Sequence, residues 1–196
     1  MSTEAVMHDT TIEFRERKRA LEALIIDESA SLFRMARRLM GDDEEARDLL
    51  QDTFLKAHVS IEGFRAESSL KTWVVSILIN QGLKKLRRRK LSRRVARLFG
   101  KGPEIVPGGP AEWGAHIDNP EQIASLRERA ASLQAAMNVL SPRQHTVFVL
   151  RYLEQRSIDE IARLMNIASG TVKTHLVRAL GRIRDHESSG QEAGDE

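Results

Sequence analysis

Hydrophobic residues recur every three or four positions through most of the chain, which is the spacing of one face of an α-helix. One such stripe spans residues 33–40 and is followed by Gly41, a residue that often ends a helix. A second spans residues 42–58 and begins with Asp42 and Glu45, which have the spacing of a capping box. Sustained alternation of polar and apolar residues, the mark of a β-strand, is missing from the sequence. The pattern predicts an all-α protein.

A third helix is predicted after Ser68 or Ser69, either of which can cap the apolar stripe that follows. This helix runs into a basic block. Ten of the eighteen residues from Lys84 to Lys101 are Lys or Arg and none is acidic, although the whole chain has a net charge of only +3. Such a concentration of positive charge favours a polyanion, such as nucleic acid, as partner.

Glycine and proline are dense between residues 99 and 119, which predicts a flexible linker. It divides the chain into an N-terminal helical domain, 1–98, and a second small domain, 120–186. Asn119 and Pro120 have the order of an N-cap and a first helical residue, so we expect the second domain to begin there. Residues 187–196 are rich in acids and are predicted to form a disordered tail.

The second domain contains two short predicted helices joined by a tight turn. Ser157 and Glu160 can form a capping box for the first helix, and Ser169 can cap the second. The second helix is predicted to pack through an apolar stripe made of Val172, Leu176, Leu180 and Ile183. Its open side then carries small, polar or basic residues that suit a DNA major groove: Ser169, Gly170, Thr171, Lys173, Thr174, His175 and Arg178. These features favour a DNA-binding helix-turn-helix over a helical hairpin with a solvated face.

This helix-turn-helix resembles the promoter-binding domain of extracytoplasmic-function (group IV) sigma factors. Through the run 170–176 it is also similar to the output domain of LuxR-type response regulators. The N-terminal half separates the two families, because the runs 48–57 and 64–73 resemble the N-terminal domain of the sigma family in order and spacing. LuxR-type regulators have nothing similar there. The chain therefore resembles an extracytoplasmic-function sigma factor over most of its length.

The resemblance implies two sets of contact residues in the N-terminal half. The helix 42–58 would dock on a coiled coil of the RNA polymerase beta-prime subunit through its polar face, formed by Asp48, Gln51, Asp52 and Lys56. The following segment would melt the minus-ten promoter element and contact its DNA through Phe64, Arg65, Ser69, Lys71, Thr72, Asn80, Lys84 and Lys85. The helix that reads the minus-thirty-five element would be the second helix of the helix-turn-helix. Trp73 lies on the apolar stripe and is predicted to be a core residue.

The resemblance implies a sigma factor that binds core RNA polymerase through its beta-prime and beta subunits and directs it to promoter DNA. It would open that DNA with binding energy alone, and an anti-sigma factor is an expected partner. If the free chain packs its two domains together, we expect the contact to involve residues 48–56 or the recognition helix. The alternatives are a LuxR-type regulator that binds operators without polymerase, and a structural or RNA-binding helical protein that binds without sequence specificity.

Other classes of function find no support in the sequence. With no cysteine, disulfides and thiolate metal sites are excluded, and the histidines have no metal-ligand spacing. We find no phosphate-binding glycine loop and no nucleophile paired with a base, so we expect no enzyme, no cofactor and no metal. The apolar runs are too short to cross a bilayer and no signal peptide is recognisable, which predicts a cytoplasmic protein without membrane insertion.

Overall fold

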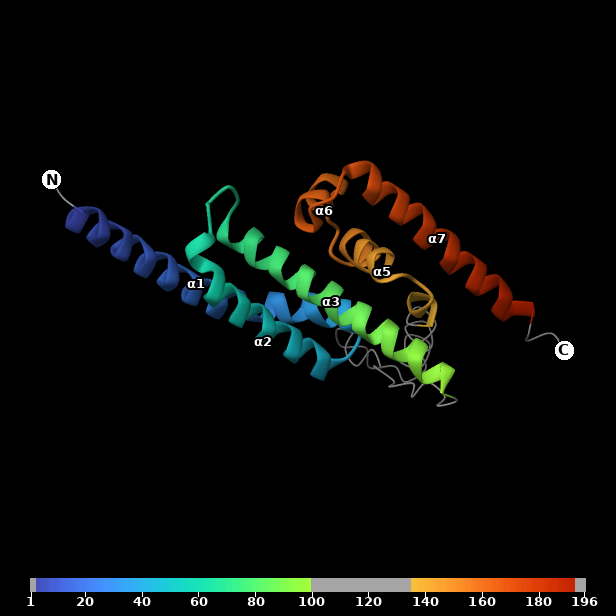
Figure 1. The fold of residues 1–196 in the computed structure, drawn as a ribbon. Coiled ribbons are helices and arrows are strands. Elements are labelled where there is room, and N and C mark those ends of the chain that lie inside the picture. The colour runs from blue at the N-terminus through green and yellow to red at the C-terminus, as the bar shows by residue number, and fades with distance from the viewer. Residues whose placement is uncertain (1–2, 100–134, 193–196) are drawn as a thin grey trace, which may run out of the picture.

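The computed structural model describes residues 3–99 and 135–192, and the regular structure in these two ranges is entirely helical. The first range contains α1 (Thr3–Met40), α2 (Asp43–Ser60), the short 3-10 helix η1 (Ile61–Gly63) and α3 (Leu70–Leu98). The second contains α5 (Pro142–Phe148), the π-helix η2 (Val149–Leu153), α6 (Ile158–Met165) and α7 (Ser169–Glu192). Figure 1 shows α1, α2 and α3 as one bundle, with α5 and α6 lying along α3. The all-α prediction is confirmed.

The turn between α1 and α2 is built from local signals. Gly41 has a φ of 77°, which a glycine adopts without strain, and its N–H donates to the Arg37 carbonyl at 2.7 Å. The Asp42 side chain then accepts from the Glu45 N–H at 2.9 Å and caps α2 as predicted. The Glu45 carboxylate accepts from Arg89 at 3.1 Å. This contact ties the start of α2 to α3.

The core of the N-terminal bundle is formed by the apolar stripes of its three helices. Leu39, Leu49 and Leu78 are fully buried, one from each helix. Thr53 is buried with them, and its hydroxyl donates to the Leu49 carbonyl at 2.7 Å, so no polar atom of this side chain is left unpaired.

Gly82 lies where α3 packs against α1 and α2, so substitutions at this position show how closely the three helices pack. A Cβ atom built at Gly82 would lie 3.4 Å from the Leu49 Cδ2 and 3.6 Å from the Leu39 Cδ1, which is ordinary contact with flexible side-chain ends. We expect Gly82→Ala to raise the free energy of unfolding by about 0.5–1 kcal/mol, because alanine favours a helix interior. Gly82→Leu should lower it by overpacking. Urea unfolding measures both; a destabilising alanine would contradict this packing.

The second domain is built on two complete capping boxes. Ser141 accepts from the Gln144 N–H at 3.3 Å, and the Gln144 side chain accepts from the Ser141 N–H at 2.9 Å. Ser157 and Glu160 do the same at the start of α6. The predicted linker from residue 100 onward and the predicted start at Asn119 and Pro120 lie outside the described residues. At the other end α7 continues to Glu192, beyond the predicted domain boundary at 186.

The two halves pack against each other, mainly through α3 with α5 and α6 and through α1 with η2. Arg38 of α1 donates to the Leu153 carbonyl at 2.9 Å and to the Glu154 carboxylate at 2.7 Å. Lys90 of α3 donates to the Leu140 carbonyl at 3.3 Å. Neither α2 nor α7, on which the sequence placed the expected contact, provides the main contacts between the halves.

Candidate nucleic-acid interface

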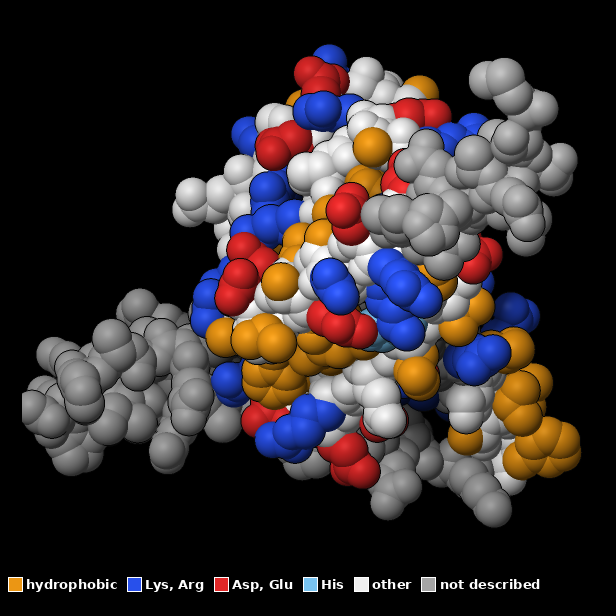
Figure 2. All heavy atoms as spheres, turned by 90° about the vertical axis from the view of Figure 1, so that its left-hand side faces the viewer, with side chains coloured by type: hydrophobic (Ala, Val, Ile, Leu, Met, Phe, Trp, Pro, Cys, Tyr) orange, Lys and Arg blue, Asp and Glu red, His pale blue; other side chains and the backbone are white. Residues whose placement is uncertain are grey.

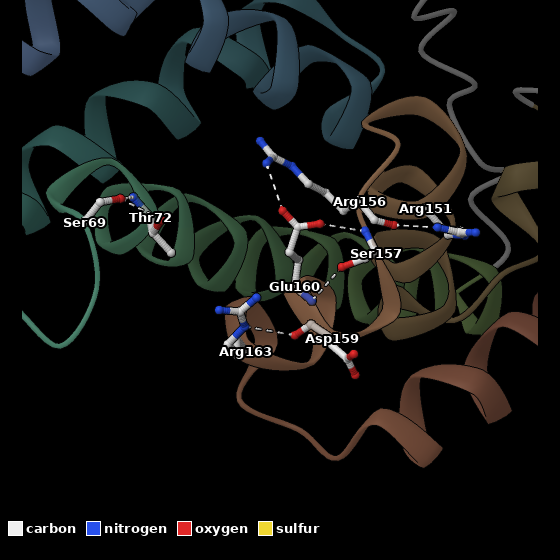
Figure 3. Close-up of polar contacts among 8 residues, drawn as sticks. All are labelled: Ser69, Thr72, Arg151, Arg156, Ser157, Asp159, Glu160 and Arg163. Atoms are coloured by element: carbon white, nitrogen blue, oxygen red, sulfur yellow. Dashed lines mark hydrogen bonds and ion pairs between the residues drawn. The ribbon is translucent and has the colours of Figure 1, made fainter.

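The geometry of the helix-turn-helix is fixed at the start and end of α6. The Ser157 hydroxyl accepts from the Glu160 N–H at 3.2 Å, and the Glu160 carboxylate accepts from the Ser157 N–H at 2.8 Å (Figure 3). These bonds from the Ser157 backbone and side chain hold the pKa of Glu160 below its usual value. At the far end Asn166 adopts the left-handed conformation, with φ of 50°, and stops the helix. The turn to α7 is therefore as short as the sequence predicts.

Helix α7 begins at Ser169, with the Val172 N–H donating to the Ala168 carbonyl at 3.2 Å. Ala168 thus occupies the cap position that the sequence assigned to Ser169. Val172 and Leu176 are buried as predicted, but Leu180 is 45% exposed and Ala179 is buried in its place. The helix therefore packs on a face turned slightly from the predicted one.

Six of the seven predicted groove-facing residues are exposed, and they are Ser169, Gly170, Thr171, Lys173, Thr174 and Arg178. A Cβ built at Gly170 would meet nothing within 4 Å, so this first turn is open to a partner. The Thr174 hydroxyl donates back to the Gly170 carbonyl at 3.0 Å, which leaves its oxygen as the available acceptor. Small residues and two long cations thus share one accessible surface.

His175 is the exception, because its side chain is only partly exposed. Both ring nitrogens are buried without a hydrogen-bond partner among the described residues. Burial lowers the pKa of His175, and the nearby charges of Arg143 and Arg178 lower it further. His175 is therefore less accessible than the sequence predicted, and its contact with DNA stays a prediction.

The predicted minus-ten segment has its polar groups engaged within the chain. The Ser69 hydroxyl accepts from the Thr72 N–H at 3.1 Å and lies 2.8 Å from the Thr72 hydroxyl (Figure 3). Lys71 pairs with Glu28 of α1 at 2.7 Å. Arg65 is exposed on the loop that precedes α3. Binding of DNA here would exchange these internal bonds for bonds to the nucleotide.

Phe64 and Trp73 form an aromatic pair beside those groups. Their ring centroids are 5.3 Å apart with the planes tilted by 51°. Both side chains are half-buried and pack against the core of the bundle. The core assignment of Trp73 is confirmed, and Phe64 is held against it with one part of its ring accessible. The pair offers an apolar wall at the start of α3.

The structure brings the predicted polymerase-binding and DNA-binding residues of the N-terminal half together. Lys85 of α3 lies 3.0 Å from the Asp52 carboxylate and 4.0 Å from that of Asp48, both on α2. Gln51 and Lys56 of the same helix are exposed, as are Asn80 and Lys84 of α3. One ion-pair cluster therefore joins two surfaces that the sequence treated as separate.

Two exposed apolar residues extend the polar face of α2 and were missed by the sequence reasoning. Leu55 is 59% exposed and Val59 is 77% exposed. They lie seven and eleven positions after Asp48, which places them on the same side of the helix. Figure 2 views the end of the molecule where α2 finishes, and it shows hydrophobic side chains gathered among charges of both signs. The spacing from Asp48 was the signal that could have identified them.

Within the described ranges, no group of three or more His, Cys, Asp or Glu side chains has the geometry to hold a metal ion. No helix there combines the length and apolar character needed to span a bilayer.

Comparison with known families assigns both halves of the chain. Sigma-70 region 2 matches residues 24–92, and Sigma-70 region 4 matches residues 130–183. A sigma-E factor of Streptomyces avermitilis is 31% identical over 93% of this chain and 89% of its own length. The factor SigW of Bacillus subtilis, an extracytoplasmic-function sigma factor, is 29% identical over 78% of this chain and 81% of its own length. The region 2 match excludes the LuxR-type alternative, which rested on the C-terminal half alone.

A solved structure has the same fold. The sigma factor RpoE of Bartonella quintana, in complex with the anti-sigma factor NepR, aligns with a TM-score of 0.60 and 28% identity, over 85% of this chain and 96% of that one. Sigma factors bind core RNA polymerase and are not enzymes. The chain belongs to the extracytoplasmic-function sigma factors, which direct RNA polymerase to promoters.

Proposed function

We propose that this sigma factor reads the minus-thirty-five promoter element with the start of α7. The observation that carries the proposal is the exposed first turn of α7, which follows a capped α6 and a left-handed turn at Asn166. Its small residues allow the backbone to approach phosphates, and Lys173 and Arg178 reach further to phosphates or guanine edges. The main contacts between the two halves leave this surface uncovered.

Lys173→Ala and Arg178→Ala test this assignment separately. Each should weaken binding of the polymerase complex to the upstream element by ~1–3 kcal/mol if a base contact is lost, and by less if only a phosphate contact is lost. Binding of the chain to polymerase should not change. Electrophoretic mobility shifts of the complex on wild-type and mutated elements measure both effects. Arg184→Ala, an exposed arginine further along α7, is the matched control; unchanged promoter occupancy in both variants would refute the assigned face.

The start of α3 is proposed to open the minus-ten element. The Phe64 and Trp73 pair supplies an apolar wall, and Ser69, Lys71 and Thr72 supply hydrogen-bond donors beside it. An extruded base needs both kinds of group, a stacking surface and polar partners for its edge. Asn80 and Lys84 are exposed further along α3 and would contact the adjoining backbone. Arg65, exposed on the loop before α3, would reach the displaced strand.

The exposed face of α2 is proposed to dock on the beta-prime subunit of RNA polymerase. Asp48, Gln51, Asp52 and Lys56 lie on that face, and Leu55 and Val59 add apolar area beside them. A face that combines apolar and polar side chains in this way is typical of protein interfaces. Segments of the chain other than α2 would then make the contacts with the beta subunit.

Promoter recognition also requires the two halves to separate. The minus-ten and minus-thirty-five elements are named by their positions, which are about 25 base pairs apart. This separation is ~85 Å along the DNA at ~3.4 Å per base pair. Helix α3 has 29 residues, so it is ~43 Å long at ~1.5 Å per residue. Because α6 packs on α3, the start of α7 lies too near the minus-ten residues for both elements to be bound at once. The packed arrangement is therefore proposed as a form that does not initiate transcription.

An anti-sigma factor is the proposed partner of the packed form. The relative from Bartonella quintana was solved with such a factor, and this chain aligns with nearly all of it.

The decisive experiment for the whole proposal is a pull-down of core RNA polymerase by the chain, followed by run-off transcription on a genomic promoter library. Transcripts that depend on the chain and share two spaced elements are expected. Sequence-specific DNA binding without any binding to polymerase would contradict it.

A further inference from the structure

A cavity of about 490 Å³ lies between the two halves of the chain. One wall is the C-terminal part of α3, and the other is the segment that leads into α5, together with the end of α1. Figure 1 shows these parts meeting at the end of the molecule where α3 finishes. This volume falls within the range of sites for small organic ligands. Neither promoter binding nor polymerase docking, as proposed above, uses this space.

Positive charge is concentrated in the α3 wall. Five cations of α3 line the cavity, and they are Arg89, Lys90, Arg93, Arg94 and Arg97. Among the described residues, Arg89 of this set forms an ion pair with Glu45 at 3.1 Å. Lys90 and Arg93 donate instead to neutral oxygens, the Leu140 carbonyl and the Asn138 side chain, each at 3.3 Å. Figure 2 shows the opposite end of the molecule, where acids and bases alternate.

Among the described residues, Glu45 is the one acid whose charge acts on this wall. Burial and the charge of Arg182 lower the pKa of Lys90. Burial lowers the pKa of Arg93, and Arg89 and Arg97 lower it further, against an opposing effect of Glu45. An anion placed between these groups would remove the mutual repulsion. Several guanidinium groups that line one space favour phosphate, because each can donate two parallel hydrogen bonds to it.

The opposite wall is apolar and contains one unsatisfied polar atom. Leu39, Met40, Met137 and Pro142 line it. The buried His145 also lines the cavity, and its Nδ1 has no hydrogen-bond partner among the described residues. Burial, with a smaller effect of Arg89, lowers the pKa of His145 to about 4, so the imidazole is neutral. An apolar wall with a neutral hydrogen-bonding group suits a heterocyclic base better than a bare ion.

We propose that this cavity binds a nucleoside di- or triphosphate, with the phosphates on the cations of α3 and the base against the apolar wall. Since the cavity is lined by residues of both halves, the bound nucleotide holds the halves together. This consequence rests on the packed form proposed above, but binding itself does not depend on the promoter assignments. The apolar wall and His145 distinguish the site from the outer surface of α3, where Arg87 and Arg88 are exposed and do not line the cavity.

Isothermal titration of the purified full chain with ATP, GTP, adenosine and inorganic tripolyphosphate tests the site. We expect one nucleotide bound per chain, no binding of adenosine, and binding of tripolyphosphate at least 10-fold weaker than that of the better nucleotide. Arg93→Gln should weaken nucleotide binding at least 10-fold. Arg94→Gln, at an exposed cation of the same wall, should weaken it as well if Arg93→Gln fails to fold.

Arg88→Gln is the matched control, since it removes the same charge from the same helix outside the cavity. Equal weakening by Arg88→Gln and Arg93→Gln would show unspecific attraction to the basic block and overturn the site. Tripolyphosphate binding as tight as nucleotide would overturn the role of the apolar wall, and absence of nucleotide binding would overturn the whole inference. The α7 variants test promoter recognition, and the titrations test nucleotide binding by the cavity. Each proposal can therefore fail without the other.

Discussion

Replacing Gln51 and Asp52 together with alanine is expected to weaken binding to core RNA polymerase by roughly 30-fold or more while the fold stays intact. Both side chains are exposed on α2 and point away from the buried residues of that helix. Residues at the centre of an interface commonly contribute ~2 kcal/mol or more, and ~1.4 kcal/mol corresponds to a factor of ten in Kd. Titration of labelled chain with core polymerase, followed by fluorescence anisotropy, measures the change.

The structure separates this effect from a loss of stability. The Asp52 side chain forms an ion pair with Lys85, and a pair this exposed contributes ~0–1 kcal/mol. Asp27→Ala removes one exposed acid from α1 and is the control for the change in charge. Normal assembly of the double variant with polymerase would show that α2 docks elsewhere. Equal weakening by Asp27→Ala would point to general charge repulsion.

The ends of the helices were predictable because the signals that set them are local. Gly41 accepts a positive φ, and Ser69, Ser141 and Ser157 each accept a hydrogen bond from the residue three positions on. These bonds depend on a few neighbouring residues, so a single sequence contains the information. The apolar stripes likewise identified the buried Leu39, Leu49 and Leu78, because burial follows the helical period.

Features that depend on distant residues could not be predicted in the same way. His175 has the helical position of a groove-facing residue, but Arg143 of α5 lies near enough to lower its pKa, and its ring nitrogens are covered. Lys85 was assigned to DNA alone, yet in the fold it meets Asp48 and Asp52 of α2. The period of a helix shows which residues share a side but not which neighbours cover that side.

The main contacts between the two halves could not be predicted for the same reason. The sequence draws attention to charged or unusual faces, and these are residues 48–56 and the recognition helix. The chain instead packs its halves through α3, α5 and α6 and through a contact of Arg38 with the end of η2. Arg38 lies in a basic turn of α1 and Glu154 lies 116 positions away. Nothing local distinguishes either residue from an ordinary solvated charge.

Glu154→Arg is expected to open the packed form. The Glu154 side chain is only 12% exposed where it meets Arg38, so reversing its charge places two cations in a partly desolvated contact. We expect this change to shift the balance toward separated halves by ~1–3 kcal/mol, or roughly 5- to 150-fold. The chain has no cysteine, so Lys18→Cys and Val177→Cys give two exposed labelling sites, one in each half. Energy transfer between the labels should fall.

Charge exchange distinguishes a specific contact from general damage. Arg38→Glu combined with Glu154→Arg should restore energy transfer, because the pair is rebuilt with opposite polarity. Asp159→Arg, which makes the same change in charge at an exposed site of the same domain, should have no effect. If separation of the halves limits promoter recognition, Glu154→Arg should also raise the apparent affinity of the polymerase complex for the promoter in proportion to the newly populated open form. Unchanged energy transfer in Glu154→Arg would mean that α3, α5 and α6 hold the halves together without this pair, and that the apolar contacts between them dominate.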